Sequence, residues 1–401
     1  MVVYGQTGTA PNIGGVIVKK LTKTLCFSFI FIFLLSSCDS LSKKNVKDVK
    51  GTETPPQEVK VEEVKKAKVT IAGDIMFHDG LIQSAYLGNN KGYDFHYMFE
   101  DIKPRIINSD VAAVCLEGSM HPTWKPTGYP CFNTPASALD ALKDTGFDII
   151  SMANNHVMDT GKAGFYNYLD EIKKRNLLVT GAGLPEDDKI AYIEKNGIKM
   201  ALIAYTYGTN GIPAPEGTVN YIDEEKIKND IIKAKGKCDF VMVWLHMGNE
   251  YVRKVEDEQY RLYREVADMG ADMVIGSHPH VPKKSEVYDS NGRKVWIIYS
   301  LGNFLSAQRP KEAEKTYLYT DVGLIADFTV VKDKDGVHIE DADITPIYDL
   351  KYREGNRIIY RIVECSKIND YKEATQEQKN YVNKKYNELI GEHDMSVFKH
   401  N

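Results

Sequence analysis

The sequence predicts an α/β domain, and two observations support this fold class. From residue 68 onward, short β-rich runs alternate with stretches whose apolar residues recur at a helical period. Polar residues follow directly after several of the β-rich runs, as they do at the carboxyl ends of parallel strands. Alternation of this kind is typical of buried sheets that are covered by helices.

The expected elements follow in chain order. Strands are expected at residues 69–72, 110–116, 147–152, 199–205, 240–245, 273–275, 295–299, 322–331 and 337–344. Helices are expected at residues 164–175, 224–235, 256–269 and 374–390. The last two strands flank Lys334-Asp335-Gly336, a turn sequence that predicts a hairpin.

The first 66 residues predict export and a lipid anchor. Three lysines precede a short apolar run at residues 25–35, which ends in Leu-Ser-Ser-Cys38. This pattern is typical of a secretory signal, and the run is shorter than the roughly 20 residues of a spanning helix. We therefore expect a signal peptide with a lipobox at residues 1–37, then a lipidated Cys38 and a solvated tether at residues 38–66. An uncleaved signal anchor is the alternative.

This reading places the protein at the cell membrane, held by its lipid, with the folded domain exported from the cytoplasm. That domain is expected at residues 67–350, followed by a C-terminal helical extension at residues 351–401.

Composition and charge narrow the range of possible functions. Hydrophobic residues make up 43% and charged residues 27% of the 401 residues, which is ordinary for a globular domain. The formal net charge is -5 and there is no basic block, so a nucleic-acid partner is not expected. The six cysteines form no CxxC pair, which disfavours a structural zinc knuckle.

The polar residues at the expected strand ends predict a shared metal site. They are Asp74, Glu117, Asn154, Asn155, His156, His246, His278, His280 and Asn303. Imidazole and carboxylate ligands suit Mn²⁺, Zn²⁺ or Fe²⁺. Each residue alone has an ordinary explanation, such as a turn cap or a core histidine. His278 and His280 are two apart, and in an extended segment such residues face the same side.

Six blocks of sequence, in order, resemble those of the CapA family of poly-γ-glutamate capsule proteins. They are Gly73-Asp74-Ile75-Met76, Leu116-Glu117, Ala153-Asn154-Asn155-His156, His246-Met247-Gly248-Asn249-Glu250-Tyr251, Gly276-Ser277-His278-Pro279-His280-Val281 and Tyr299-Ser300-Leu301-Gly302-Asn303-Phe304. The resemblance implies a four-layer αββα sandwich like that of metallophosphatases, the calcineurin-type phosphoesterase fold. It also implies a role in capsule synthesis, export or anchoring, with an anionic surface polymer and capsule-synthesis membrane proteins as partners.

The resemblance also implies roles for individual residues. The expected ligands of one or two divalent ions are Asp74, Glu117, Asn155, His246, His278 and His280. His156 would be the catalytic acid, oriented by Asp159, and the expected substrate contacts are Asn154, Glu250, Tyr251 and Asn303. Three departures stand out. Cys115 occupies a position where family members usually carry Asn, and Glu117 one where the phosphoesterases have a bridging Asp. Met76 stands where the phosphoesterases have a His, and His78 is either its substitute or a bystander.

Three functions remain open at this point. The first is a metal-dependent hydrolase acting on amide bonds of poly-γ-glutamate or on a related polymer. The second is a surface metallophosphoesterase, and the third is a non-catalytic polymer-binding or export partner. Lys283, Lys284 and Arg293 follow the histidine block and would either meet an anionic chain or form a solvated face, which is the commoner case.

Overall fold

The structure is a computed structural model that describes residues 63–311, 313 and 315–399. The expected signal peptide, Cys38 and nearly all of the expected tether lie outside these residues. No helix in the described part of the chain has the length and apolar character needed to cross a membrane.

The first of two sheets contains eight strands. They are β1 (Lys65–Ile75), β2 (Val111–Leu116), β3 (Ile149–Ser151), β4 (Leu178–Thr180), β11 (Asn303–Leu305), β12 (Val322–Asp333), β13 (Gly336–Glu354) and β14 (Arg357–Glu364). Their order is β14-β13-β12-β1-β2-β3-β4, and β11 pairs with β1. Strands β1 to β4 run parallel, whereas β12, β13 and β14 are antiparallel to their neighbours.

The second sheet contains six strands. They are β5 (Ile190–Lys195), β6 (Ile198–Thr206), β7 (Phe240–His246), β8 (Met273–Ser277), β9 (Ser285–Ser290) and β10 (Arg293–Ile298). Their order is β5-β6-β7-β8-β10-β9, with β6, β7, β8 and β10 parallel and the two edge strands antiparallel.

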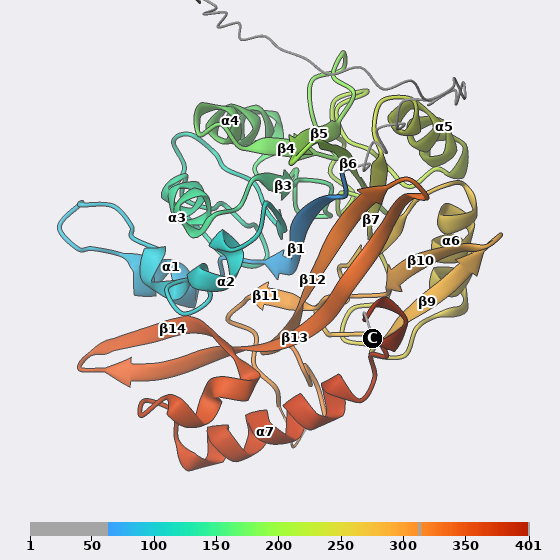
Figure 1. The fold of residues 1–401 in the computed structure, drawn as a ribbon. Helices are drawn as coiled ribbons and strands as arrows, with labels where there is room; N and C mark the ends of the chain where they lie inside the picture. The colour runs from blue at the N-terminus through green and yellow to red at the C-terminus, as the bar shows by residue number, and fades with distance from the viewer. Residues whose placement is uncertain (1–62, 312, 314, 400–401) are drawn as a thin grey trace, which may run out of the picture. The chain divides into compact units, whose positions relative to one another are not determined.

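Most of the helices lie on the outer sides of the two sheets, whereas the last helix packs against the inter-sheet cluster. The helices are α1 (Asp79–Ala85), α2 (Lys103–Ile107), α3 (Ser137–Thr145), α4 (Gly161–Lys174), α5 (Glu224–Lys235), α6 (Asp257–Asp268) and α7 (Gln376–Ile390), with short 3-10 turns η1 (His96–Met98), η2 (Cys365–Asp370) and η3 (Ser396–Phe398). Figure 1 shows α3 and α4 on one flank and α5 and α6 on the opposite one. Helix α7 lies beneath β13 and β14 in the same view.

Three hydrophobic clusters correspond to the three interfaces of a four-layer domain. One joins the two sheets, one joins the first sheet to α1–α4, and one joins the second sheet to α5 and α6. In β7, Met242 and Trp244 face the other sheet, and Val243 and Leu245 face the helices. A strand buried on both faces must be apolar throughout, which explains the unbroken apolar runs in the sequence. The expected four-layer αββα sandwich is therefore confirmed.

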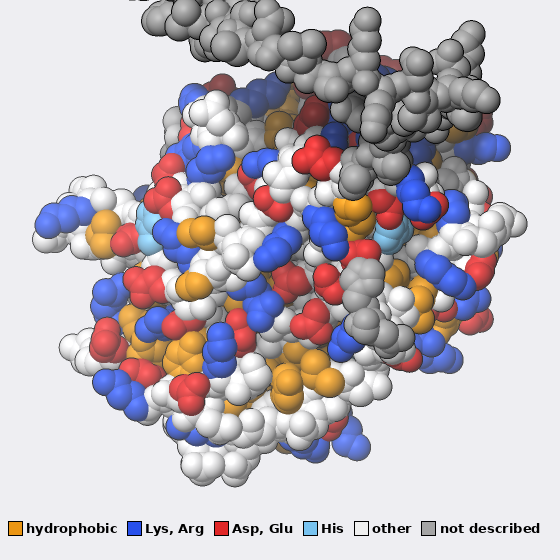
Figure 2. Space-filling model, in the orientation of Figure 1, with side chains coloured by type: hydrophobic (Ala, Val, Ile, Leu, Met, Phe, Trp, Pro, Cys, Tyr) orange, Lys and Arg blue, Asp and Glu red, His pale blue; other side chains and the backbone are white. Residues whose placement is uncertain are grey.

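The predicted central strands, the four predicted helices and the β12–β13 hairpin are all present. Five strands were not predicted: β4, β5, β9, β11 and β14. The first sheet continues beyond residue 350, because β13 ends at Glu354 and β14 pairs with it. On the face drawn in Figure 2, acidic and basic side chains are interspersed without a dominant patch of either sign.

Candidate metal centre

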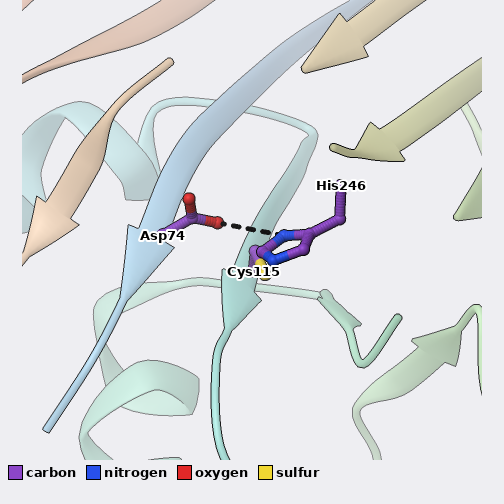
Figure 3. Close-up of side chains that lie close together, drawn as sticks. All are labelled: Asp74, Cys115 and His246. Carbon is purple, nitrogen blue, oxygen red and sulfur yellow. Dashed lines mark ion pairs between the residues drawn. The ribbon is translucent and has the colours of Figure 1, made fainter. Parts of the chain in front are cut away.

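The carboxyl ends of four buried strands meet between the two sheets. Asp74 lies near the end of β1, Glu117 follows β2, His246 ends β7 and His278 follows β8. All four side chains are buried, with exposed fractions of 3% or less. Figure 3 shows the Asp74 carboxylate pointing toward the His246 imidazole, with Cys115 of β2 beside them. The first sheet thus supplies carboxylates and the second sheet supplies imidazoles.

Close backbone packing positions Asp74. A Cβ on Gly73 would lie 2.0 Å from the carbonyl oxygen of Gly302, so only glycine allows this approach. The Asp74 N–H donates to that same carbonyl oxygen at 3.0 Å. The backbone N–H of His278 donates to Asp74 Oδ2 at 2.9 Å and so joins the two sheets directly.

The histidine loop reaches the site by a different backbone path from the one expected. His278 and His280 have φ values of +92° and +58°, so the segment is not extended. The expectation of an extended pair is wrong, although the two rings do converge, with centroids 5.8 Å apart. Positive φ is costly for residues other than glycine, and such residues cluster at functional sites because the surrounding structure holds them in place.

Glu117 belongs to two overlapping groups of candidate ligands. One group is Asp74, Glu117 and His280, and the other is Glu117, His246 and His278. Within each group the ligand atoms lie within 4.8 Å of one another. Glu117 could therefore contribute a ligand atom to either group. Cys115 joins Asp74 and His246 in a third group, and Glu250 joins His278 and His280 in a fourth.

Several buried donor atoms of the site have no hydrogen-bond partner. Asp74 Oδ1 and both side-chain oxygens of Glu117 have none, and neither does His278 Nδ1. The nearest imidazole nitrogens, on His156 and His280, lie 3.8 and 3.9 Å from Glu117 Oε1, which is too far for a hydrogen bond. Buried charged groups are normally paired or bound to metal. These unpartnered atoms therefore fit a divalent cation.

Burial shifts the pKa values of five candidate ligands toward their neutral forms: Asp74, Glu117, His246, His278 and His280. It raises the pKa of Asp74 to about 6, against the hydrogen bond from the His278 backbone, which lowers it. It raises the pKa of Glu117 well above its usual range, and the charge of Asp74 raises it further. It lowers the pKa of His278 to about 3 and those of His246 and His280 well below their usual range. Neutral imidazoles are the form that binds metal.

Neighbouring polar groups hold the His246 imidazole in position. Asn155 Oδ1 lies 2.8 Å from His246 Nε2, and Ser277 Oγ lies 2.8 Å from His246 Nδ1. Asn155 itself donates through Nδ2 to Asn210 Oδ1 at 3.3 Å. Asn210, in the loop after β6, was not predicted from the sequence. A metal-binding histidine is usually oriented by such partners.

His156 and Asp159 form a pair, as expected. Nδ1 of His156 lies 2.8 Å from Asp159 Oδ2, so Nε2 is on the side of Glu117. Asp159 Oδ2 also accepts the backbone N–H of Phe132 at 2.7 Å. The Phe132 ring packs edge-on against His156, with ring centroids 4.8 Å apart. The imidazole is therefore fixed by a hydrogen bond on one side and an aromatic ring on another.

A pocket of about 300 Å³ opens onto this centre. Among the expected site residues it is lined by Asn155, His156, Glu250, Tyr251 and His280. Asn154 and Asn303 do not line it. They form hydrogen bonds that hold other groups in place. Asn303 is hydrogen-bonded to His280. Asn154 is hydrogen-bonded to the backbone of four residues: Leu116, Gly118, Met152 and His156.

The aromatic residues of the loop after Glu117 and the basic residues after the histidine block have different surroundings. Tyr129 and Phe132 line the pocket, whereas Trp124 stacks on His121 outside it. Lys283 is fully buried and donates to Glu256 and Gln259, so it is not a polymer contact. Arg293 is paired with Asp272. The four cysteines in the described part of the chain are free.

The fold and the site together define a two-sheet α/β sandwich with a candidate metal centre of histidines and carboxylates. The sequence model of the bacterial capsule synthesis protein family PGA_cap matches residues 68–308, which is more than half of the chain. The chain therefore belongs to this family.

Two curated relatives have capsule names. The PGA biosynthesis protein CapA of Bacillus subtilis (strain 168) is 39% identical over 181 residues, which cover 44% of this chain and 47% of the relative. The capsule biosynthesis protein CapA of Bacillus anthracis is 31% identical over 268 residues, which cover 62% of each chain. The matched region is thus about half to three-fifths of the length of these relatives.

Solved structures with a related arrangement include two with phosphatase names. One is a novel phosphatase from Mycoplasma pneumoniae, with a TM-score of 0.45 and 16% identity, covering 71% of this chain and 95% of that one. Another is the calcineurin-like phosphoesterase YfkN from Bacillus subtilis, with a TM-score of 0.41 and 15% identity, covering 80% and 100%.

Proposed function

We propose that this protein acts in capsule biosynthesis as a metal-dependent hydrolase of an anionic surface polymer such as poly-γ-glutamate. The observation that carries the proposal is Glu117. Its carboxylate is fully buried, has no hydrogen-bond partner and belongs to two groups of candidate ligands. A divalent cation would offset the cost of burying this carboxylate beside Asp74.

The donor set indicates which residues would hold the metal. Asp74, Glu117 and His280 would hold one ion, and Glu117, His246 and His278 a second. Mixed imidazole and carboxylate donors suit Mn²⁺, Zn²⁺ or Fe²⁺. A bound ion would supply Lewis acidity for a carbonyl or phosphoryl oxygen and would lower the pKa of a water molecule.

The chain's own residues would position the substrate and move the proton. His156 would donate a proton from Nε2 to the leaving group, while its Nδ1–H stays bonded to Asp159. Glu250 and Tyr251 line the open side of the pocket, where they would contact the substrate.

Elemental analysis of the full-length chain, beside a His278→Ala/His280→Ala variant, tests this proposal. Stoichiometric Mn, Zn or Fe in the parent, lost in the folded variant, is expected. Size analysis of poly-γ-glutamate incubated with the loaded protein should then show shorter chains. Hydrolysis of p-nitrophenyl phosphate alone would indicate a phosphoesterase. Absence of bound metal after incubation with each ion would indicate a polymer-binding or export partner.

We also propose that the protein is exported and held at the cell membrane by a lipid on Cys38, where it would work beside capsule-synthesis membrane proteins. The support is the sequence pattern of a basic head, a short apolar run and Leu-Ser-Ser-Cys38. Labelled fatty acid should enter the parent but not Cys38→Ala, and Cys38→Ala should leave the membrane fraction. Equal labelling of the two proteins would exclude the anchor.

A further inference from the structure

A second pocket, of about 460 Å³, has a basic lining. It is lined by Arg253, Lys254, Val255, Tyr260, Lys284 and Glu392, and we call it the basic pocket. Three cations thus face one carboxylate. None of the residues named above as its lining belongs to the candidate metal centre.

Two segments of chain connect the basic pocket to the metal centre. The Tyr251 N–H donates to the Pro279 carbonyl oxygen at 2.8 Å, and Arg253 Nε donates to that of Pro282 at 3.0 Å. Both segments therefore leave the metal centre side by side and in the same direction. Lys284 is four residues beyond His280, so the two sites are separated by no more than roughly 13 Å of extended chain.

Two of the three cations are available to a ligand. Arg253 is held by Glu392, with an N–O distance of 2.5 Å, and lies over the ring of Tyr319. Lys284 lies over the ring of Tyr260. Within the described ranges, neither Lys254 nor Lys284 forms an ion pair. Both side chains are exposed, unlike the buried Lys283.

Two other pockets at or beside the metal centre lack a basic lining. The metal-site pocket itself has no Lys or Arg in its lining. A third pocket, of about 660 Å³, includes Met247, the residue after His246, in its lining. Five acidic residues and one arginine also line it. An anionic chain that reaches the metal centre would be repelled by this acidic pocket and attracted to the basic one.

We propose that the basic pocket is an anion subsite, in which Lys254 and Lys284 bind a carboxylate of a polymer chain whose reacting bond lies at the metal centre. This inference rests on the proposed function. A polymer with a carboxylate on every repeat unit would occupy both sites at once. A small phosphomonoester would reach only the metal centre.

Binding of a long poly-γ-glutamate fraction and of the dipeptide γ-glutamyl-glutamate to the full-length chain tests the subsite. In Lys254→Gln/Lys284→Gln, polymer affinity should fall about tenfold at low salt, and the preference for polymer over dipeptide should narrow. High salt should remove the difference from the parent. Glu392→Gln removes the one carboxylate of the pocket and should tighten polymer binding.

The matched control is Lys91→Gln/Lys228→Gln, which removes two exposed charges elsewhere and should bind polymer like the parent. Parental polymer affinity in Lys254→Gln/Lys284→Gln, or an equal loss in the control, would overturn the subsite. So would a parent that does not bind the polymer at low salt. This experiment measures binding, so it tests the subsite even if the protein cleaves no bond. The hydrolase proposal is tested separately, by metal content and by cleavage of the polymer.

Discussion

Asn303 Oδ1 lies 3.1 Å from Nδ1 of His280, and this contact determines which imidazole nitrogen keeps a free lone pair. The Asn303 amide nitrogen donates to Gln308 Oε1 and to the Thr320 carbonyl oxygen. Its Oδ1 is therefore the acceptor, and His280 Nδ1 carries the hydrogen. Nε2 of His280 is left as a free ligand atom, 3.9 Å from Glu117 Oε1.

The first prediction follows from this contact. Asn303→Leu should weaken metal binding about tenfold, because loss of a partner that orients a ligand typically costs tenfold or more in affinity. Asn303→Asp keeps an acceptor for His280 and should bind metal more tightly than Asn303→Leu. Titration of the apoprotein with Mn²⁺ measures both variants. Equal affinities would show that His280 does not depend on this hydrogen bond.

The second prediction concerns the proton donor. Asp159→Asn should lower the turnover rate about 100-fold and leave metal content unchanged, since positioned acids contribute roughly 10²–10⁴ to rate. The measurement is kcat as a function of pH on whichever substrate is cleaved. Asp170→Asn, on the exposed side of α4, is the matched control and should behave as the parent. Loss of metal together with activity in Asp159→Asn would point to a structural role instead.

The third prediction concerns the approach of Gly73 to Gly302. Gly73→Ala should lower the free energy of unfolding by about 2 kcal/mol, because overpacking of a filled site typically costs 1–3 kcal/mol. It should also weaken metal binding, because the backbone shift moves Asp74. Urea unfolding and metal titration measure the two effects. Gly208→Ala is the control, because no atom lies within 4 Å of a Cβ built there.

The fourth prediction concerns pH. Burial, and then the charge of Arg253, lowers the pKa of His393 from 6.5 to about 4. The unfolded state therefore binds more protons between these values, so this group's stabilisation is present above pH 6.5 and is lost as the pH falls toward 4. The loss from this group is up to roughly 3 kcal/mol.

Urea unfolding of the parent and of His393→Gln across this pH range isolates the contribution. The variant should lose less stability on acidification than the parent, because glutamine does not titrate. Parallel pH profiles of the two proteins would show that His393 does not contribute.

The central strands and the polar residues after them were predictable because strands buried on both faces leave long apolar runs in the sequence. The edge strands were harder to predict from the sequence. The β5 and β9 strands are partly exposed and mix polar with apolar residues, so their pattern is weak. The Asn196-Gly197 and Asn291-Gly292 dipeptides of their hairpins were the available signal.

The identities of the site residues were more predictable from the sequence than the contacts between them. Asn210 follows β6, a predicted strand, and the dipeptide Asn210-Gly211 marks a turn at that strand's end, so the same reasoning would have found it. The sharing of Glu117 between two groups was implied only by the resemblance, which places it at the position of a bridging Asp. The residue pattern alone could not show it, because it depends on the spacing between the two sheets. That spacing is set by side-chain packing across the inter-sheet cluster, including Trp244 and Trp296.

The late strands have a consequence for the order of folding during synthesis. Every expected metal ligand lies before residue 281, but β11 and β12, which flank β1, come later in the chain. Asp74 is paired with Asn303 across the β1–β11 contact. A ribosome-bound chain that ends just after His280 would therefore contain all the expected ligands. It would still lack the strands that support Asp74, the first ligand. Metal capture should be a late event, completed only after β12 has emerged and joined β1.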